Sequence, residues 1–165
     1  MMSDDPEITL YQNLGKMSAD YSALEEYLRL AVQALIAEDK VLGKILTAEL
    51  SFRQLVALLS SLYKYRESNV TRIDKLHNIL DEINRLSERR NRMVHSMWDH
   101  VGSTKEIFRV KTTSKYKDGL KVKIENVNPA EVNQLANEIV YSTIEIVQFI
   151  KEWLSVNPNF ISKVK

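Results

Sequence analysis

The sequence predicts an all-α fold, a four-helix up-down bundle with a β-hairpin inserted between helices 3 and 4. Only 4 glycines and 3 prolines occur in 165 residues, which favours long helices over many short strands. Apolar residues recur every three or four positions in four long stretches, as on the buried face of an amphipathic helix. One Asp-Gly pair, at 118–119, separates two β-prone runs and is typical of a hairpin turn.

The first helix is expected at about 8–37, because eight residues at helical spacing form one stripe: Leu10, Leu14, Met17, Tyr21, Leu24, Leu28, Ala31 and Leu35. A second helix is expected at about 41–65, with a stripe formed by Ile45, Phe52, Leu55, Leu59 and Leu62. The connection between them is short, which predicts antiparallel neighbours.

A third helix is expected at about 70–98, after a polar segment, 67–69, that offers an N-cap. Its apolar stripe is Ile73, Leu76, Leu80, Ile83, Val94 and Met97, and polar residues interrupt it at Ser87, Arg90 and Asn91. The hairpin is expected at about 106–125, and a fourth helix at about 129–155, with Asn128 as N-cap and Pro129 in the first turn. The stripe of this helix is Val132, Leu135, Ile139, Thr143, Ile146, Ile150 and Trp153. We expect residues 1–165 to form a single domain, since this length is typical of one.

The composition excludes several classes of site. The chain has no cysteine, which excludes disulfides and thiolate chemistry, and only three histidines. No apolar run is long enough for a membrane span, and the polar, acidic segment 1–7 is unlike a secretory signal, so we expect a cytoplasmic protein with no membrane partner. The formal charge of +1 argues against a general nucleic-acid coat, but it hides −6 in residues 1–39, +3 in 85–92 and +5 in 105–123.

The interruption in the third helix could carry chemistry. Asn91 and His95 are four residues apart, on one helical face, and Arg90 flanks them. Histidine transfers protons near neutral pH, arginine holds phosphate oxygens, and an amide can orient either. RNA carries its own nucleophile, the 2′-hydroxyl, so neither a metal nor a cofactor is expected. The spacing alone is more typical of a solvated basic turn near a helix end.

The fuller string favours a functional interpretation. Residues 90–95 match an Arg-Asn-x-x-x-His motif near the end of the third long helix of a bundle. This resembles the HEPN superfamily (higher eukaryotes and prokaryotes nucleotide-binding). Residues 50–55 also resemble the small bacterial single-domain members, and the resemblance extends from about Leu10 to Trp153. The hairpin between the last two helices departs from the common arrangement of that family.

The resemblance implies a homodimer formed through the motif-bearing helices, with two motifs in one cleft. It implies a metal-independent endoribonuclease, a toxin or antiphage effector, that leaves a 2′,3′-cyclic phosphate. Arg90 would stabilise the scissile phosphate, His95 would be the general acid or base, and Asn91 would orient one of the two. Two alternatives stay open. The chain could be a non-catalytic HEPN module that binds a nucleotide or a partner, such as an antitoxin, in a toxin–antitoxin or defence complex, or it could be a plain structural bundle.

Basic residues of the hairpin are candidates for contacts with the RNA backbone, namely Arg109, Lys111, Lys115 and Lys117, together with Arg89 and Arg92 of the helix. Strand alternation predicts Arg109 and Lys111 on one face, with Phe108 and Val110 on the other. The same charges could instead protect an exposed sheet edge from aggregation. His77 is interpreted as a surface or boundary residue, and Trp98 as packing under the hairpin. His100 is expected to hydrogen-bond locally, although it could instead lend a second imidazole to the cleft.

Overall fold

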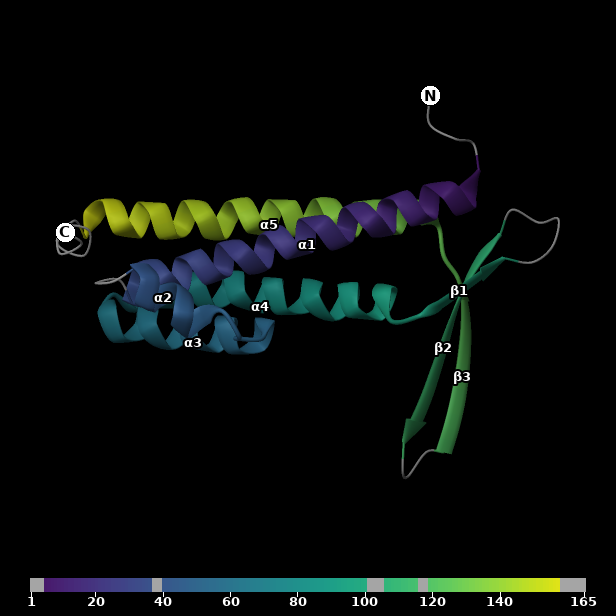
Figure 1. The fold of residues 1–165 in the computed structure, drawn as a ribbon, viewed down its shortest axis with the longest axis horizontal. Coiled ribbons are helices and arrows are strands. Elements are labelled where there is room, and N and C mark those ends of the chain that lie inside the picture. Colours follow the sequence, from purple (N-terminus) through teal and green to yellow (C-terminus); the bar gives the residue numbers. More distant parts are fainter. Residues whose placement is uncertain (1–4, 37–39, 101–105, 116–118, 158–165) are drawn as a thin grey trace. The chain divides into compact units, whose positions relative to one another are not determined.

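The computed structural model describes residues 5–36, 40–100, 106–115 and 119–157. In these ranges the chain is mostly helical, as predicted, with a small antiparallel sheet (Figure 1). The elements follow one another as α1 (Pro6–Ile36), α2 (Lys40–Thr47), α3 (Phe52–Arg66), α4 (Val70–Val94), β1 (Met97–His100), β2 (Ile107–Lys115), β3 (Gly119–Asn126) and α5 (Pro129–Val156). No helix in the described ranges has the length and apolar character that a membrane span requires.

The chain divides into two compact units, and each long helix except α3 contributes to both. One unit contains the described residues up to Asp20 together with the segment from Leu86 to Glu138, and therefore includes the sheet. The other contains the segment from Tyr21 to Arg85 together with the chain from Ile139 onwards. We refer to them as the sheet unit and the helical unit.

The core of the helical unit consists of the apolar stripes that the sequence indicates. Tyr21 and Leu24 of α1, Leu55 of α3, Leu76 of α4 and Ile139 of α5 are all buried. The ring of Tyr21 packs on that of Phe52, with 5.3 Å between centroids. Burial of such side chains contributes about 1.5–3 kcal/mol each, which makes these stripes the main source of stability of the unit.

The predicted helix 41–65 is wrong, because the chain forms two helices there. Ser51 is the N-cap of α3: its hydroxyl accepts a hydrogen bond from the backbone N–H of Gln54 (3.4 Å), and the Gln54 side chain accepts one from the backbone N–H of Ser51 (2.9 Å). This capping box starts a new helix and separates it from α2. Ile45 consequently lies exposed on α2, and Tyr63 is buried where Leu62 was expected.

The short helix α2 attaches to α1 through Thr47. The Thr47 hydroxyl accepts a hydrogen bond of 2.8 Å from the side chain of Gln33 and donates one of 2.9 Å to the carbonyl of Gly43. Arg29 donates from Nε to the carbonyl of Thr47 at 3.2 Å. These bonds satisfy groups at the end of α2, where the last carbonyls lack a helical partner.

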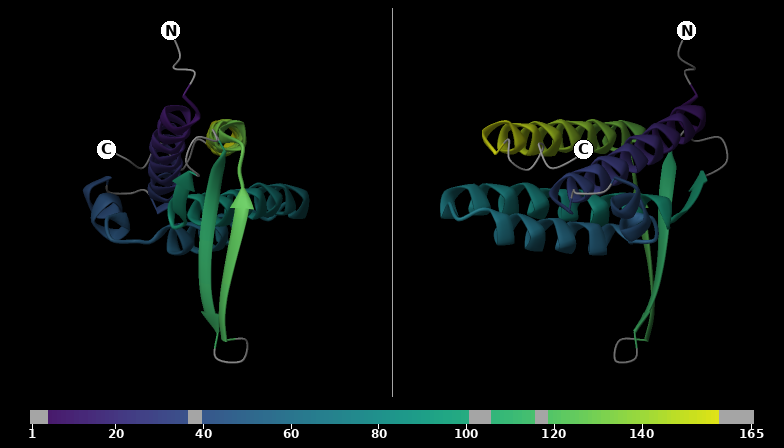
Figure 2. Two further views of the ribbon diagram at one scale, coloured as in Figure 1. Left: turned by 90° about the vertical axis from the view of Figure 1, so that its right-hand side faces the viewer. Right: turned by 60° about the vertical axis from the view of Figure 1, so that its left-hand side comes forward.

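The predicted helix 70–98 is four residues too long. It begins as expected, with the side chain of Asn69 accepting a hydrogen bond of 3.2 Å from the backbone N–H of Arg72, but it ends at Val94. Residues 97–100 form β1 and pair antiparallel with 107–110 of β2, so the predicted two-stranded hairpin is a three-stranded sheet of order β1-β2-β3. Figure 2 shows β2 and β3 as a long ribbon.

The start of α5 agrees with the prediction. Asn128 accepts a hydrogen bond of 2.9 Å from the backbone N–H of Ala130, and Pro129 is the first helical residue. Within the sheet unit, the Asn13 side chain of α1 donates to the carbonyl of Pro129 at 2.9 Å, and Lys16 donates to the side chain of Asn137 at 3.0 Å. The first parts of α1 and α5 therefore lie side by side.

Candidate functional site

The C-terminal end of α4 carries the three motif residues. Arg90 is half-buried, and its Nη1 donates a hydrogen bond of 3.1 Å to Oδ1 of Asn91. Asn91 is exposed, and its backbone carbonyl accepts a hydrogen bond of 3.0 Å from the backbone N–H of His95. The amide therefore holds the guanidinium of its neighbour, while the backbone of the same residue anchors His95.

His95 is the first residue after α4, and its imidazole is exposed. The exposed ring is accessible to a ligand. Ser87, about one turn before Asn91, is buried. The interruption of the apolar stripe thus runs from a buried hydroxyl to an exposed imidazole along the last two turns of the helix.

Two apolar side chains flank His95 on the surface. Val94 is 37% exposed and Met97 is 63% exposed, although the apolar stripe predicted both to lie in the core. The end of α4 at Val94 turns the chain into β1, which removes Met97 from the helical stripe. The surface around the imidazole is therefore partly apolar.

The sheet packs against this end of α4. The indole Nε1 of Trp98 donates a hydrogen bond of 3.0 Å to the carbonyl of Met93, and Nη1 of Arg109 lies 3.3 Å from the sulfur of Met93. The Trp98 bond occupies one of the carbonyls that a helix end leaves without a partner. Trp98 thus belongs to β1 and bonds the end of α4, whereas its packing under the hairpin stays a prediction.

Arg109 and Lys111 lie on one face of the ribbon, as the alternation predicts. The register places Arg109 opposite Glu125 and Lys111 opposite Lys123. The Arg109 side chain is only 13% exposed, because it forms an ion pair with Glu125 and contacts Met93. Hydrogen bonds from Lys123 and then from Arg109 lower the pKa of Glu125 to about 2. Arg109 is therefore mainly a structural residue of the sheet, whereas Lys123 presents its charge to solvent.

The opposite face of the ribbon is apolar and exposed. Leu120, Val122 and Ile124 of β3 alternate with the charged residues and are all exposed. The charged residues of β3 therefore lie on one face of the ribbon only. Two of the predicted RNA contacts are not placed here: Lys117 lies outside the described residues, and so does the side chain of Lys115.

The other basic residues of α4 have separate environments. Arg89 forms an ion pair with Glu138 of α5 within the sheet unit. Arg92 is exposed and donates from Nε to the carbonyl of Glu88 at 3.4 Å. Of the other histidines, His77 is half-buried, in agreement with the predicted boundary position, and its Nε2 lies 3.2 Å from the hydroxyl of Ser60. The side chain of His100 lies outside the described residues.

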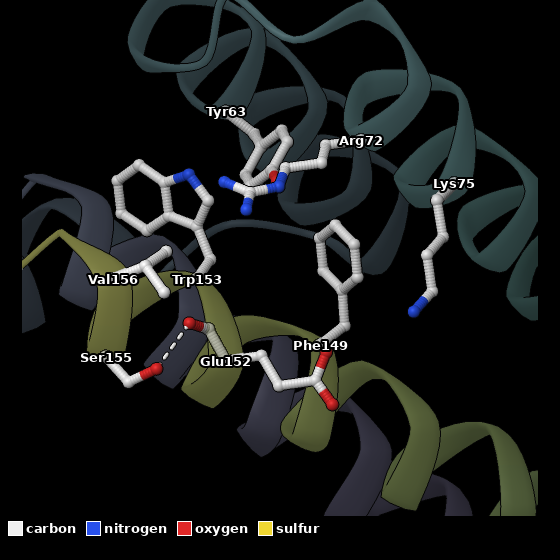
Figure 3. Close-up of a pocket in the computed structure, with 8 residues that line it drawn as sticks. All are labelled: Tyr63, Arg72, Lys75, Phe149, Glu152, Trp153, Ser155 and Val156. Atoms are coloured by element: carbon white, nitrogen blue, oxygen red, sulfur yellow. Dashed lines mark hydrogen bonds between the residues drawn. The ribbon is translucent and has the colours of Figure 1, made fainter.

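A pocket of about 310 Å³ in the helical unit was not anticipated from the sequence. It combines cations with aromatic rings and is lined by Tyr63, Arg72, Lys75, Phe149, Glu152, Trp153, Ser155 and Val156 (Figure 3). These residues come from three helices and share no motif. The only local signal is the polar segment 67–69, which we interpreted as a cap alone. No known family model, curated protein or solved structure matches the chain.

Proposed function

We propose that the protein is a metal-independent endoribonuclease of the HEPN type, active as a homodimer and acting as a toxin or an antiphage effector. The observation that carries this proposal is the exposed imidazole of His95, five residues after Arg90, together with the hydrogen bond of 3.1 Å by which Asn91 restrains the Arg90 guanidinium. The proposal includes the four-helix up-down layout of that superfamily, with α1, α3, α4 and α5 as its helices.

The three residues suit cleavage of RNA by its own 2′-hydroxyl. An imidazole at His95 removes the proton of the 2′-hydroxyl, and the 2′-oxygen forms a bond to phosphorus while the bond from phosphorus to the 5′-oxygen breaks. A protonated imidazole donates the proton that the leaving 5′-oxygen needs. Arg90 stabilises the charge that develops on the phosphate oxygens. The products are a 2′,3′-cyclic phosphate and a 5′-hydroxyl.

The proposed dimer supplies the second imidazole. Val94 and Met97 are exposed apolar residues on either side of His95, and their burial against a second copy would bring two His95 side chains to one cleft. Contact between the two copies would also cover the partly apolar surface that one copy leaves in water. The interface is thus expected at the junction of α4 and β1.

The test is cleavage of a mixed RNA pool in EDTA by the wild type, His95→Ala and Arg90→Ala. We expect both variants to lose activity by about 10²–10⁴-fold, the typical contribution of acid–base and charge-stabilising groups. Arg85→Ala is the matched control, because Arg85 is an exposed arginine on the same helix that pairs with Glu82. It should cleave like the wild type. Replacement of the cleaved nucleotide by its 2′-deoxy form should abolish cleavage.

A further variant tests the dimer. Met97→Glu places a charge on the proposed interface, so it should produce a monomer by sedimentation and abolish cleavage. Equal cleavage by the wild type and the two motif variants would show that the assignment of the site is wrong. A folded protein that cleaves no RNA but co-purifies with a nucleotide or an antitoxin-like protein would instead support the non-catalytic alternative.

A further inference from the structure

The pocket of the helical unit is lined by none of the three motif residues, so we treat it as a separate site. Tyr63 comes from α3, Arg72 and Lys75 come from the first two turns of α4, and Phe149 and Trp153 come from α5 (Figure 3). Its volume of about 310 Å³ is at the lower end of the range for small-molecule sites. The pocket therefore fits a ligand with about one ring and a short polar substituent.

One wall of the pocket is aromatic. The ring centroid of Tyr63 lies 5.3 Å from that of Phe149 and 5.6 Å from that of Trp153, in tilted geometry. All three side chains are almost fully buried, so their positions are held by the core. Rings packed at these distances favour a further aromatic group, which can add edge-to-face or offset contacts.

The cations lie beside that wall. Nζ of Lys75 is 5.5 Å from the ring centroid of Phe149, and Arg72 donates from Nη1 to Glu67 at 3.4 Å. The Glu67 carboxylate also accepts hydrogen bonds from the indole of Trp153 and from the backbone of Asn69, which fixes its position. Glu67 uses only one of the five N–H donors of the guanidinium, so Arg72 is oriented and can still bind an anion.

The hydroxyl of Tyr63 is a further polar group at this wall. It is buried and has no hydrogen-bond partner among the described residues. An unsatisfied buried donor is rare in proteins and is unfavourable. Because this oxygen has almost no accessible surface, it shapes the wall and is not counted as a donor to a ligand.

We propose that this pocket binds a small aromatic carboxylate, with its ring against Phe149 and Trp153 and its carboxylate on Arg72 and Lys75. The charge of the lining selects the carboxylate over a phosphate. Two cations and one anion, Glu152, line the pocket, so its formal charge is +1. A monoanion balances that charge, whereas a dianionic phosphate would exceed it and would meet the Glu67 carboxylate behind Arg72. The proposal is independent of the ribonuclease proposal.

The experiment is a titration of the full-length protein with phenylacetate, followed by tryptophan fluorescence. Trp98→Phe in the background leaves Trp153 as the only indole, since the chain has two tryptophans. We expect a saturable change with a dissociation constant on the order of 1 mM or tighter, as is typical for a ligand of this size. Phenylethylamine, which has the same ring but the opposite charge, should produce no change, and phenyl phosphate should bind more weakly.

Two variants identify the site. Arg72→Gln should weaken binding about tenfold or more, and Lys75→Gln several-fold. Lys75 is exposed, so Lys75→Gln should fold, and it tests the site even if Arg72→Gln does not fold. Lys151→Gln is the matched control, because Lys151 is exposed on α5 and does not line the pocket. Failure of phenylacetate to saturate, equal binding of phenylethylamine, or unchanged affinity in both cation variants would overturn the proposal.

Discussion

The indole Nε1 of Trp153 donates a hydrogen bond of 3.1 Å to Oε2 of Glu67. This bond joins the last turns of α5 to the three-residue connection between α3 and α4. The same carboxylate accepts a hydrogen bond of 2.9 Å from the backbone N–H of Asn69 and one of 3.4 Å from Arg72. With only 10% of its side chain exposed, Glu67 is the centre of the polar contacts at this end of the helical unit.

Glu67→Ala should lower the free energy of unfolding by about 2–4 kcal/mol, because it removes charge-assisted hydrogen bonds and leaves the buried indole N–H of Trp153 without an acceptor. Urea denaturation at neutral pH measures this. Glu145→Ala, an exposed glutamate on α5, is the control and should change stability by about 0.5 kcal/mol or less. A loss for Glu67→Ala no larger than that of the control would contradict the assigned role.

The Glu67 contribution should also depend on pH. The backbone N–H of Asn69, followed by smaller contributions from Arg72 and Trp153, holds the pKa of Glu67 below its usual value of 4.5. Because the folded pKa is lowered, the stabilisation is complete above the unfolded pKa and is lost as the pH falls through the folded value. The difference in stability between the wild type and Glu67→Gln should therefore decrease on acidification below about pH 4.5, as repeated denaturation series would show.

Tyr63→Phe should leave stability at neutral pH within about 1 kcal/mol of the wild type or raise it, because it removes a buried hydroxyl that lacks a partner among the described residues. Burial, and then the charge of Glu67, raises the pKa of Tyr63 to about 12. The wild type should consequently lose about 2 kcal/mol relative to the variant as the pH rises from about 10 to about 12, since the unfolded phenol ionises first. A difference in the free energy of unfolding between the two proteins that stays constant over this pH range would contradict this.

The sequence predicts helices best where apolar residues at helical spacing repeat over many turns. The stripe of α1 is an example: Leu10, Met17 and Leu24 are buried as expected, since a long amphipathic helix repeats one signal many times. The same spacing was misleading between Ile45 and Phe52, where it continued across a helix end. The capping box at Ser51 and Gln54 is the local signal that marks this boundary, which apolar periodicity alone does not show.

The remaining differences depend on contacts between distant residues. Residues 97–100 lack alternation of their own and become β1 through pairing with 107–110. The motif residues Arg90, Asn91 and His95 could be located from their spacing, but the contact of Asn91 with Arg90 rather than with the imidazole depends on side-chain rotamers. The pairing of Arg109 with Glu125 required the register of β2 and β3, which the predicted strand ranges left open.

Glu125→Gln should make the ribbon less stable at neutral pH, because Glu125 pairs with both Arg109 and Lys123. The Glu125 pKa of about 2 lies below the usual 4.5, so its stabilisation is present above about pH 4.5 and is lost as the pH falls toward 2. Hydrogen exchange of the β2 and β3 amides measures the effect. Protection of these amides in the wild type should decrease as the pH falls over that range. In Glu125→Gln, which lacks the carboxylate, protection should not show this pH-dependent decrease.

Gly15 and Gly119 should respond to alanine in opposite directions. Gly15 lies within α1, and an added Cβ would meet no atom within 4 Å, so Gly15→Ala should stabilise the protein by about 0.5–1 kcal/mol through its higher helix propensity. Gly119 begins β3 with a φ of +67°, in the left-handed region where an L side chain is strained, so Gly119→Ala should cost about 1–2 kcal/mol. Thermal denaturation of the two variants against the wild type tests both signs, and an increase in stability for Gly119→Ala would mean that the positive φ is not required there.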